Sequence, residues 1–103
     1  MLKKLFTILF IFIAFLFGNN IDLLSKATLA IGDKKYKEAL VYINKAEANN
    51  QKNPDFFRLK ALIHEMLEEP DQAMKAWKKC YKYSNDTNMR NEAKIHIHNL
   101  SNS

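Results

Sequence analysis

The feature that most constrains this chain is an internal similarity at one fixed spacing, the distance along the chain from Ala27 to Ala61. When the sequence is compared with itself at this repeat spacing, residues of like size and polarity pair along most of its length. Small residues pair at two places, Ala27 with Ala61 and Ala39 with Ala73. The remaining pairs join apolar or identical residues: Leu23/Phe57, Leu29/Ile63, Leu40/Met74, Ile43/Trp77, Ala46/Cys80, Lys26/Lys60 and Lys45/Lys79. Such a repeat indicates a structural unit that buries its apolar face by stacking on a neighbour.

Each half of the repeat predicts a helical hairpin. In the first half, apolar residues recur three and four positions apart, at Ile21, Leu24, Ala27, Ile31, Tyr36, Ala39, Leu40, Ile43 and Ala46. Gly32-Asp33 separates the two helices of this half, and Glu69-Pro70 separates those of the second half. Between the halves, a polar linker ends in Asn53, a residue suited to an N-cap, before Pro54 at the first helical position. Only two glycines and two prolines occur in the chain, which also favours helices.

Two segments resemble the tetratricopeptide repeat family. Gly32-Asp33-Lys34-Lys35-Tyr36-Lys37-Glu38-Ala39-Leu40 is similar to the family's inter-helix turn and second-helix start, and Pro70-Asp71-Gln72-Ala73-Met74, followed by Trp77 and Cys80, resembles the same stretch one repeat later. The resemblance covers about residues 20 to 85. It implies an all-α, right-handed superhelical array of two helix-turn-helix hairpins, at about residues 20–53 and 54–86, within a domain of residues 20–103.

The sequence departs from the family at a few positions. Leu23 and Phe57 replace the family's first-helix tryptophan, and His64 stands where a tyrosine is common. We therefore expect atypical angles between the repeats. A last helix is predicted over residues 87–100, with Met89, Ala93, Ile97 and Leu100 on one face. We interpret it as the capping helix that covers the final apolar face of a repeat array.

Residues 1–19 form a separate N-terminal segment. Lys3 and Lys4 precede an unbroken run, residues 5–17, whose only polar member is Thr7, and this order is typical of a secretory signal peptide. As an apolar helix, the 13-residue run would span roughly 20 Å, short of the roughly 30 Å core of a bilayer. The bulky Leu16 before Gly18 disfavours cleavage, so an uncleaved signal anchor remains an alternative. In both cases we expect export across a bacterial inner membrane, with the domain periplasmic or anchored in that membrane and facing the periplasm.

No motif predicts catalysis, a metal or a cofactor, and we expect the protein not to be an enzyme. The sequence lacks a glycine-rich phosphate loop and a serine nucleophile signature. His96 and His98 are two positions apart, about 200° around a helix axis, so they cannot bind one ion together. Cys80 occupies a small-residue position and is expected to be buried. With 16 basic and 11 acidic residues, the charge excess is too mild to imply nucleic acid.

Two surfaces are candidates for binding. In the family that the chain resembles, ligands lie on a concave surface formed by the first helix of each repeat. The resemblance therefore implies a partner groove made of Leu24, Thr28, Ile31, Arg58, Leu62 and Glu65, a mixture that suits an extended peptide or a partner helix. A separate basic stripe recurs at helical spacing on the second helix of the second repeat: Lys75, Lys78, Lys79 and Lys82. It would meet an acidic partner or anionic lipid, or serve only as a solvated face.

The sequence thus predicts a protein-binding adaptor or scaffold of the cell envelope. An alternative is a membrane-tethered structural subunit that self-associates, because two repeats are fewer than the roughly three that such arrays usually need. An enzyme regulator is a third interpretation. The patterns do not distinguish among partners.

Overall fold

The computed structural model describes residues 19–49 and 52–102, which contain five α-helices and no strand. The prediction of an all-α fold is therefore confirmed for this part of the chain. The predicted export segment lies outside the described residues except for Asn19, where the first described helix begins. The helices are α2 (Asn19–Gly32), α3 (Tyr36–Asn49), α4 (Pro54–Met66), α5 (Pro70–Tyr83) and α6 (Thr87–Ser101).

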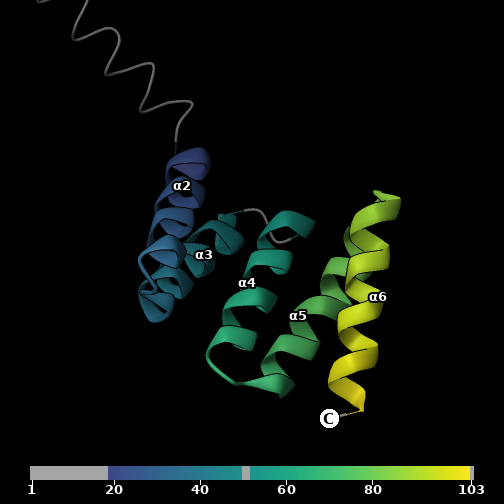
Figure 1. Ribbon diagram of the computed structural model, residues 1–103. Helices are drawn as coiled ribbons and strands as arrows, with labels where there is room; N and C mark the ends of the chain where they lie inside the picture. Colours follow the sequence, from purple (N-terminus) through teal and green to yellow (C-terminus); the bar gives the residue numbers. More distant parts are fainter. Residues whose placement is uncertain (1–18, 50–51, 103) are drawn as a thin grey trace, which may run out of the picture.

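Successive helices pack against one another (Figure 1). The helices α2 and α3 form one hairpin, α4 and α5 form a second, and α6 lies along α5. The second hairpin begins as the sequence predicts, because the Asn53 side chain accepts a hydrogen bond of 2.9 Å from the backbone N–H of Asp55 and Pro54 follows at the first helical position.

The turns inside the two hairpins have the same backbone conformation. Lys34 and Glu68, which correspond to each other at the repeat spacing, both adopt left-handed conformations, with φ of 61° and 58°. In each turn the next N–H reaches back five residues, Lys35 to Ala30 and Glu69 to His64, both at 2.8 Å. This is the Schellman arrangement, which usually places glycine at the left-handed position. Gly32 precedes that position and has no positive φ, so its conformational freedom is not what forms the turn.

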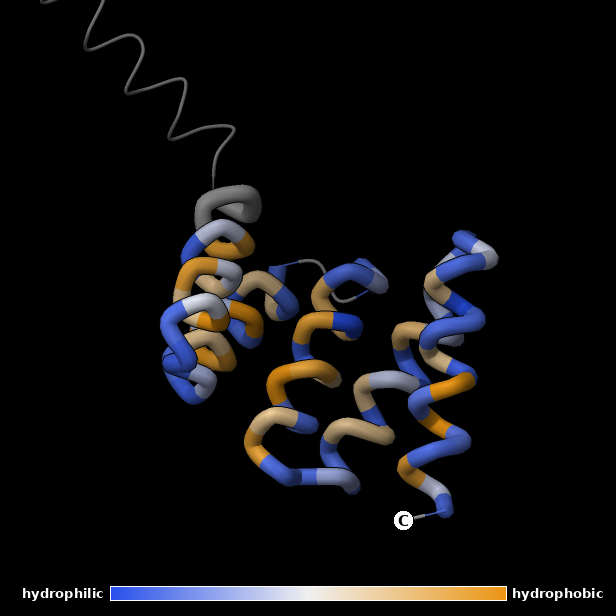
Figure 2. Tube along the Cα trace, in the orientation of Figure 1, coloured by the Kyte–Doolittle hydropathy of each residue, from blue (hydrophilic) through white to orange (hydrophobic). Residues whose placement is uncertain are grey.

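Buried residues form two cores that share α4. The first core joins α2 and α3 to one side of α4 and consists of Ala27, Ala30, Ala39, Ile43 and Ile63. The second joins the other side of α4 to α5 and α6 and consists of Phe57, Ala61, Ala73, Ala76, Trp77, Cys80 and Ala93. Figure 2 shows hydrophobic colours along the middle of α4, whereas α6 is mostly hydrophilic with short hydrophobic bands. The apolar residues predicted for α6 are among those that pack against the second core: Met89, Ala93, Ile97 and Leu100.

Many of the residues that match at the repeat spacing are buried alike. Eight of them, in four pairs, have no solvent exposure: Ala27/Ala61, Ala39/Ala73, Ile43/Trp77 and Ala46/Cys80. Alanine at the helix contacts permits close approach of the two backbones, and the larger partners fill the space between hairpins. The internal similarity of the sequence therefore corresponds to buried positions that are equivalent in the two hairpins.

Among the described residues, the first hairpin exposes two large apolar side chains, Leu29 and Val41, and α6 exposes one, Ile95. Leu29 is 70% exposed, whereas its counterpart Ile63 in the second hairpin is 1% exposed because it packs against the first hairpin. Ile95 of α6 is 60% exposed, whereas its counterpart Ala61 is fully buried against α5. Other neighbours at the two ends of the array are exposed polar residues, among them Ser25, Lys26, Asn91 and Asn99. Isolated apolar residues of this kind do not form a stacking face.

Candidate functional site

The α2 part of the predicted groove contains one exposed residue. Thr28 is exposed, and its hydroxyl donates a hydrogen bond of 2.9 Å to the carbonyl oxygen of Leu24 in the same helix. Leu24 and Ile31 are half-buried because they pack against the first core. A ligand on α2 would therefore meet the edges of two aliphatic side chains around a small polar one.

In the α4 part of the groove, Arg58 is held by the last helix. Its Nε and Nη2 atoms donate hydrogen bonds of 2.8 and 3.0 Å to the two carboxylate oxygens of Glu92 in α6. This two-point contact orients the planar guanidinium, and the hydrogen bond with Glu92 raises the pKa of Arg58 above its ordinary value. The Arg58 side chain is still 38% exposed, so the group is fixed but reachable. Leu62, one turn further, packs partly against the second core.

Glu65 connects three helices. One carboxylate oxygen accepts a hydrogen bond of 2.9 Å from the indole Nε1–H of Trp77 in α5. His96 of α6 places its Nδ1 atom 2.9 and 3.2 Å from the two oxygens of the same carboxylate. The rings of Trp77 and His96 stack with their centroids 4.2 Å apart. Because Trp77 is fully buried, Glu65 satisfies a donor that water does not reach, and its first role is structural.

Glu92 and His96 are the groove-side residues that sequence reasoning missed. The signal that would have revealed Glu92 is its distance of 34 residues from Arg58, which equals the repeat spacing. That spacing places Glu92 on α6 at the position that Arg58 holds on α4. Of the six predicted groove residues, α6 therefore contacts Arg58 and Glu65 directly.

The cysteine and the histidines have structural surroundings. Burial raises the pKa of the Cys80 thiol to about 11, so this thiol is neutral at pH 7. His64 is nearly buried, and its Nδ1 atom lies 3.3 Å from a carboxylate oxygen of Glu69. Within residues 19–49 and 52–102, no three His, Cys, Asp or Glu side chains are placed to hold one metal ion.

The four lysines of the predicted basic stripe are all exposed on α5. Two of them lie over aromatic rings: the Lys79 Nζ atom is 5.5 Å from the centroid of the Phe57 ring, and the Lys82 Nζ atom is 5.3 Å from that of Tyr83. The two rings themselves stack at 5.7 Å. Contacts of this kind hold an ammonium group near a ring face without neutralising it.

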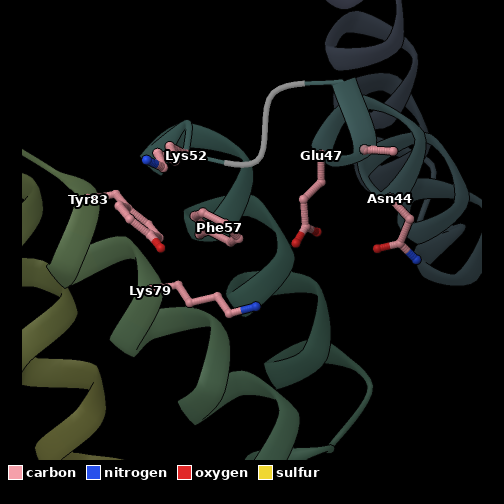
Figure 3. A pocket seen from close by; sticks show the side chains of 7 residues that line it. Asn44, Glu47, Lys52, Phe57, Lys79 and Tyr83 are labelled. Carbon is pink, nitrogen blue, oxygen red and sulfur yellow. The ribbon is translucent and has the colours of Figure 1, made fainter.

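Lys79 also lines a surface hollow of about 400 Å³, larger than two others found on the described residues (Figure 3). We call this hollow the basic cleft; its lining residues are Asn44, Glu47, Ala48, Lys52, Phe57, Lys79 and Tyr83. It lies where the end of α3, the start of α4 and the end of α5 meet. Figure 3 shows Phe57 between the side chains of Tyr83, Lys79 and Glu47, with Lys52 at the rim. Sequence reasoning found Lys79 but not the cleft, because the linker residue Lys52 enters it only through the fold.

A second hollow, of about 370 Å³, lies at the opposite end of the α4–α5 hairpin. We call it the acidic hollow; Glu65, Glu68, Glu69, Pro70 and Leu100 line it. Glu65 is the one predicted groove residue that lines any of the three hollows. The third hollow, of about 210 Å³, lies between α2 and α3 beside Leu29 and Tyr42.

Comparison with known proteins adds no assignment. The chain matches no family model, no curated protein and no solved structure. Among the helices of the described ranges, none has both the length and the apolar character required to cross a bilayer.

Proposed function

We propose that this protein is a non-catalytic adaptor of the cell envelope with a tetratricopeptide-like architecture. The architecture is supported by the recurrence, at the repeat spacing, of both the hairpin turn and the buried positions. Arrays of this kind present the first helix of each hairpin on one surface, and a partner binds there through non-covalent contacts alone. We assign the partner surface to the exposed sides of α2 and α4, with α6 beside them.

Arg58 is the observation that carries the proposal. Its guanidinium has five N–H donors, and Glu92 takes two of them, which leaves donors on the exposed edge of the group. Because Glu92 already fixes its orientation, Arg58 would lose little further side-chain entropy when a partner binds. A planar guanidinium of this kind matches a carboxylate or the carbonyl groups of a peptide.

The proposed partner is an extended peptide or a helix that meets Arg58 with an acceptor and lies over Thr28 with a small or apolar side chain. Such a ligand would use the edges of Leu24 and Ile31 without opening the first core. The proposed location is the periplasmic side of a bacterial inner membrane, with residues 5–17 as signal or anchor.

The test begins with a photocrosslinking residue at Thr28 in the full chain, in the native cell, with a matched probe at Lys37, an exposed residue of α3. We expect a foreign protein captured from Thr28 and absent from Lys37. The purified partner should then bind Thr28→Arg and Arg58→Lys at least about tenfold more weakly than the wild-type chain, because lysine keeps the charge but not the fork of donors. Lys37→Glu is the control.

Stability measurements separate binding from folding in this test. The Arg58–Glu92 pair is partly exposed, so Arg58→Lys should change the free energy of unfolding by less than about 1 kcal/mol. Capture of only the chain itself from Thr28, or equal affinity of both variants and the wild type, would contradict the proposed surface.

A further inference from the structure

The α4–α5 hairpin has oppositely charged hollows at its two ends. The basic cleft lies at the start of α4 and the end of α5, and the acidic hollow lies at the turn that joins the two helices. These are the two opposite ends of the hairpin in the ribbon of Figure 1. The volumes of about 400 and 370 Å³ are both within the range of roughly 300–1,000 Å³ typical of ligand sites. One molecule therefore carries two complementary surfaces that are too far apart to meet each other.

The basic cleft carries uncompensated positive charge. Its one acidic lining residue, Glu47, is neutralised by Lys60, whose Nζ atom lies 2.9 Å from the carboxylate. In the described part of the chain, neither Lys52 nor Lys79 pairs with a carboxylate. Phe57, only 2% exposed, forms an apolar floor. The cleft thus offers two ammonium groups, above a nearly buried aromatic ring, to an acidic segment.

The acidic turn is exposed and has carboxylates to offer. Residues 68–71 are all exposed, and the left-handed conformation of Glu68 makes this segment a sharp corner. Glu65 is engaged by Trp77 and His96, and Glu69 lies beside His64. Glu68 and Asp71 make no ion pair or side-chain hydrogen bond within residues 19–49 and 52–102. Their carboxylates are therefore available to a second molecule.

Contacts through the ends of the array are a poorer route to association. Among the described residues, the large apolar side chains exposed on the first hairpin are Leu29 and Val41, and α6 exposes Ile95, which is too little apolar area for a stable interface. Charge complementarity along the hairpin axis is the stronger feature of the surface. It also brings two faces of opposite sign together in a chain whose net charge of +5 opposes unspecific association.

We propose that the acidic turn of one copy of this chain docks in the basic cleft of a second copy. Glu68 and Asp71 would meet Lys52 and Lys79, with Lys82 beside the Tyr83 ring at the edge of the contact. Each copy contributes one surface of each kind, so the contact is head to tail and continues from copy to copy. It uses Glu68 and Asp71 rather than Thr28 and Arg58, and it does not depend on the adaptor role.

The experiment is sedimentation velocity of the full chain in neutral detergent micelles over a range of protein concentrations. The number of chains per particle should rise with concentration beyond two at low salt. It should return to one at 0.5 M NaCl, where the Debye length is about 4 Å. Two reversed variants, Lys52→Glu/Lys79→Glu and Glu68→Lys/Asp71→Lys, should each remain single chains. Lysine is tolerated at position 68 because Lys34 adopts the same conformation in the first hairpin.

Mixing the two reversed variants provides the decisive result. The negative cleft of the first matches the positive turn of the second, and the remaining two surfaces match as well, so an equimolar mixture should associate as the wild type does. Lys37→Glu/Lys94→Glu, a control with the same change of charge on exposed residues outside both hollows, should associate normally. Fluorescence of Trp77 checks folding in every variant.

Three outcomes would overturn the proposal. They are a wild-type chain that stays single at all concentrations, an association that stops at two chains and resists salt, and a mixture of the reversed variants that remains single.

Discussion

Replacement of Glu65 by alanine should destabilise the fold strongly. The substitution leaves the indole N–H of Trp77, which is fully buried, without its acceptor at 2.9 Å, and an unsatisfied buried donor costs about 1–3 kcal/mol. It also removes the partly exposed contact with His96, which adds less than about 1 kcal/mol. The free energy of unfolding should therefore fall by roughly 2–3 kcal/mol, and Tm by roughly 10–20 °C for a domain of this size.

The assay is urea unfolding of the full chain followed by far-ultraviolet circular dichroism and by the fluorescence of Trp77, the only tryptophan in the sequence. Glu65→Gln keeps an oxygen acceptor for the indole and should lose about half as much. Thr28→Ala is the matched control, because its hydroxyl bonds only within its own exposed helix, and it should stay within about 0.5 kcal/mol of the wild type. A Glu65→Ala chain as stable as this control would refute the structural role of the carboxylate.

Three further predictions concern stability. Gly32→Ala should raise the free energy of unfolding by about 0.5–1 kcal/mol, because the added Cβ meets nothing within 4 Å and φ is not positive. Lys34→Gly should raise the free energy of unfolding by about 1 kcal/mol, because glycine adopts the left-handed conformation without strain. Thermal unfolding checks both variants. A loss of stability in either variant would contradict the assigned turn. The third prediction is a pH dependence. Between the ordinary thiol pKa of 9.0 and the folded-state pKa of about 11, the unfolded chain loses the Cys80 proton while the folded chain keeps it. Stability should therefore fall as pH rises, by roughly 2–3 kcal/mol over that range, and Cys80→Ala should lack this component in urea unfolding at pH 8 and 11.

Arg58 and Glu65 are the residues whose interpretation from the sequence differs most from what the structure shows. Both were predicted as groove residues from a resemblance, and both stand at positions that a first helix presents. Their contacts depend on Glu92 and His96, which lie 34 and 31 residues further along the chain. No local pattern encodes a contact at that separation, because it depends on how α6 packs beside α4. Charge reversal at either residue would therefore test the fold before it tests a partner.

The turn of the first hairpin also shows a difference between what the sequence predicts and what the packing decides. The sequence places the break at Gly32-Asp33, and α2 does end at Gly32. The residue with the left-handed backbone conformation is nevertheless Lys34, which matches Glu68 in the turn of the second hairpin. Residue preferences indicate that a turn exists nearby, whereas the packing of the two helices decides which residue adopts the strained conformation.

Local rules were sufficient for the helices. The sequence alone predicts an all-α chain of hairpins from the spacing of its apolar residues, the Asn53 cap with Pro54, and the alanines that match at the repeat spacing. It does so because helix formation and close helix contact depend on neighbouring residues and on side-chain size. Only the tertiary structure decided which charged side chains are committed to contacts and which are open. It joined Arg58 to Glu92, and it gathered Lys52 and Lys79 into a cleft opposite the acidic turn. The physical reason is that long side chains on an exposed helix face have many possible partners, and the angles between helices select among them.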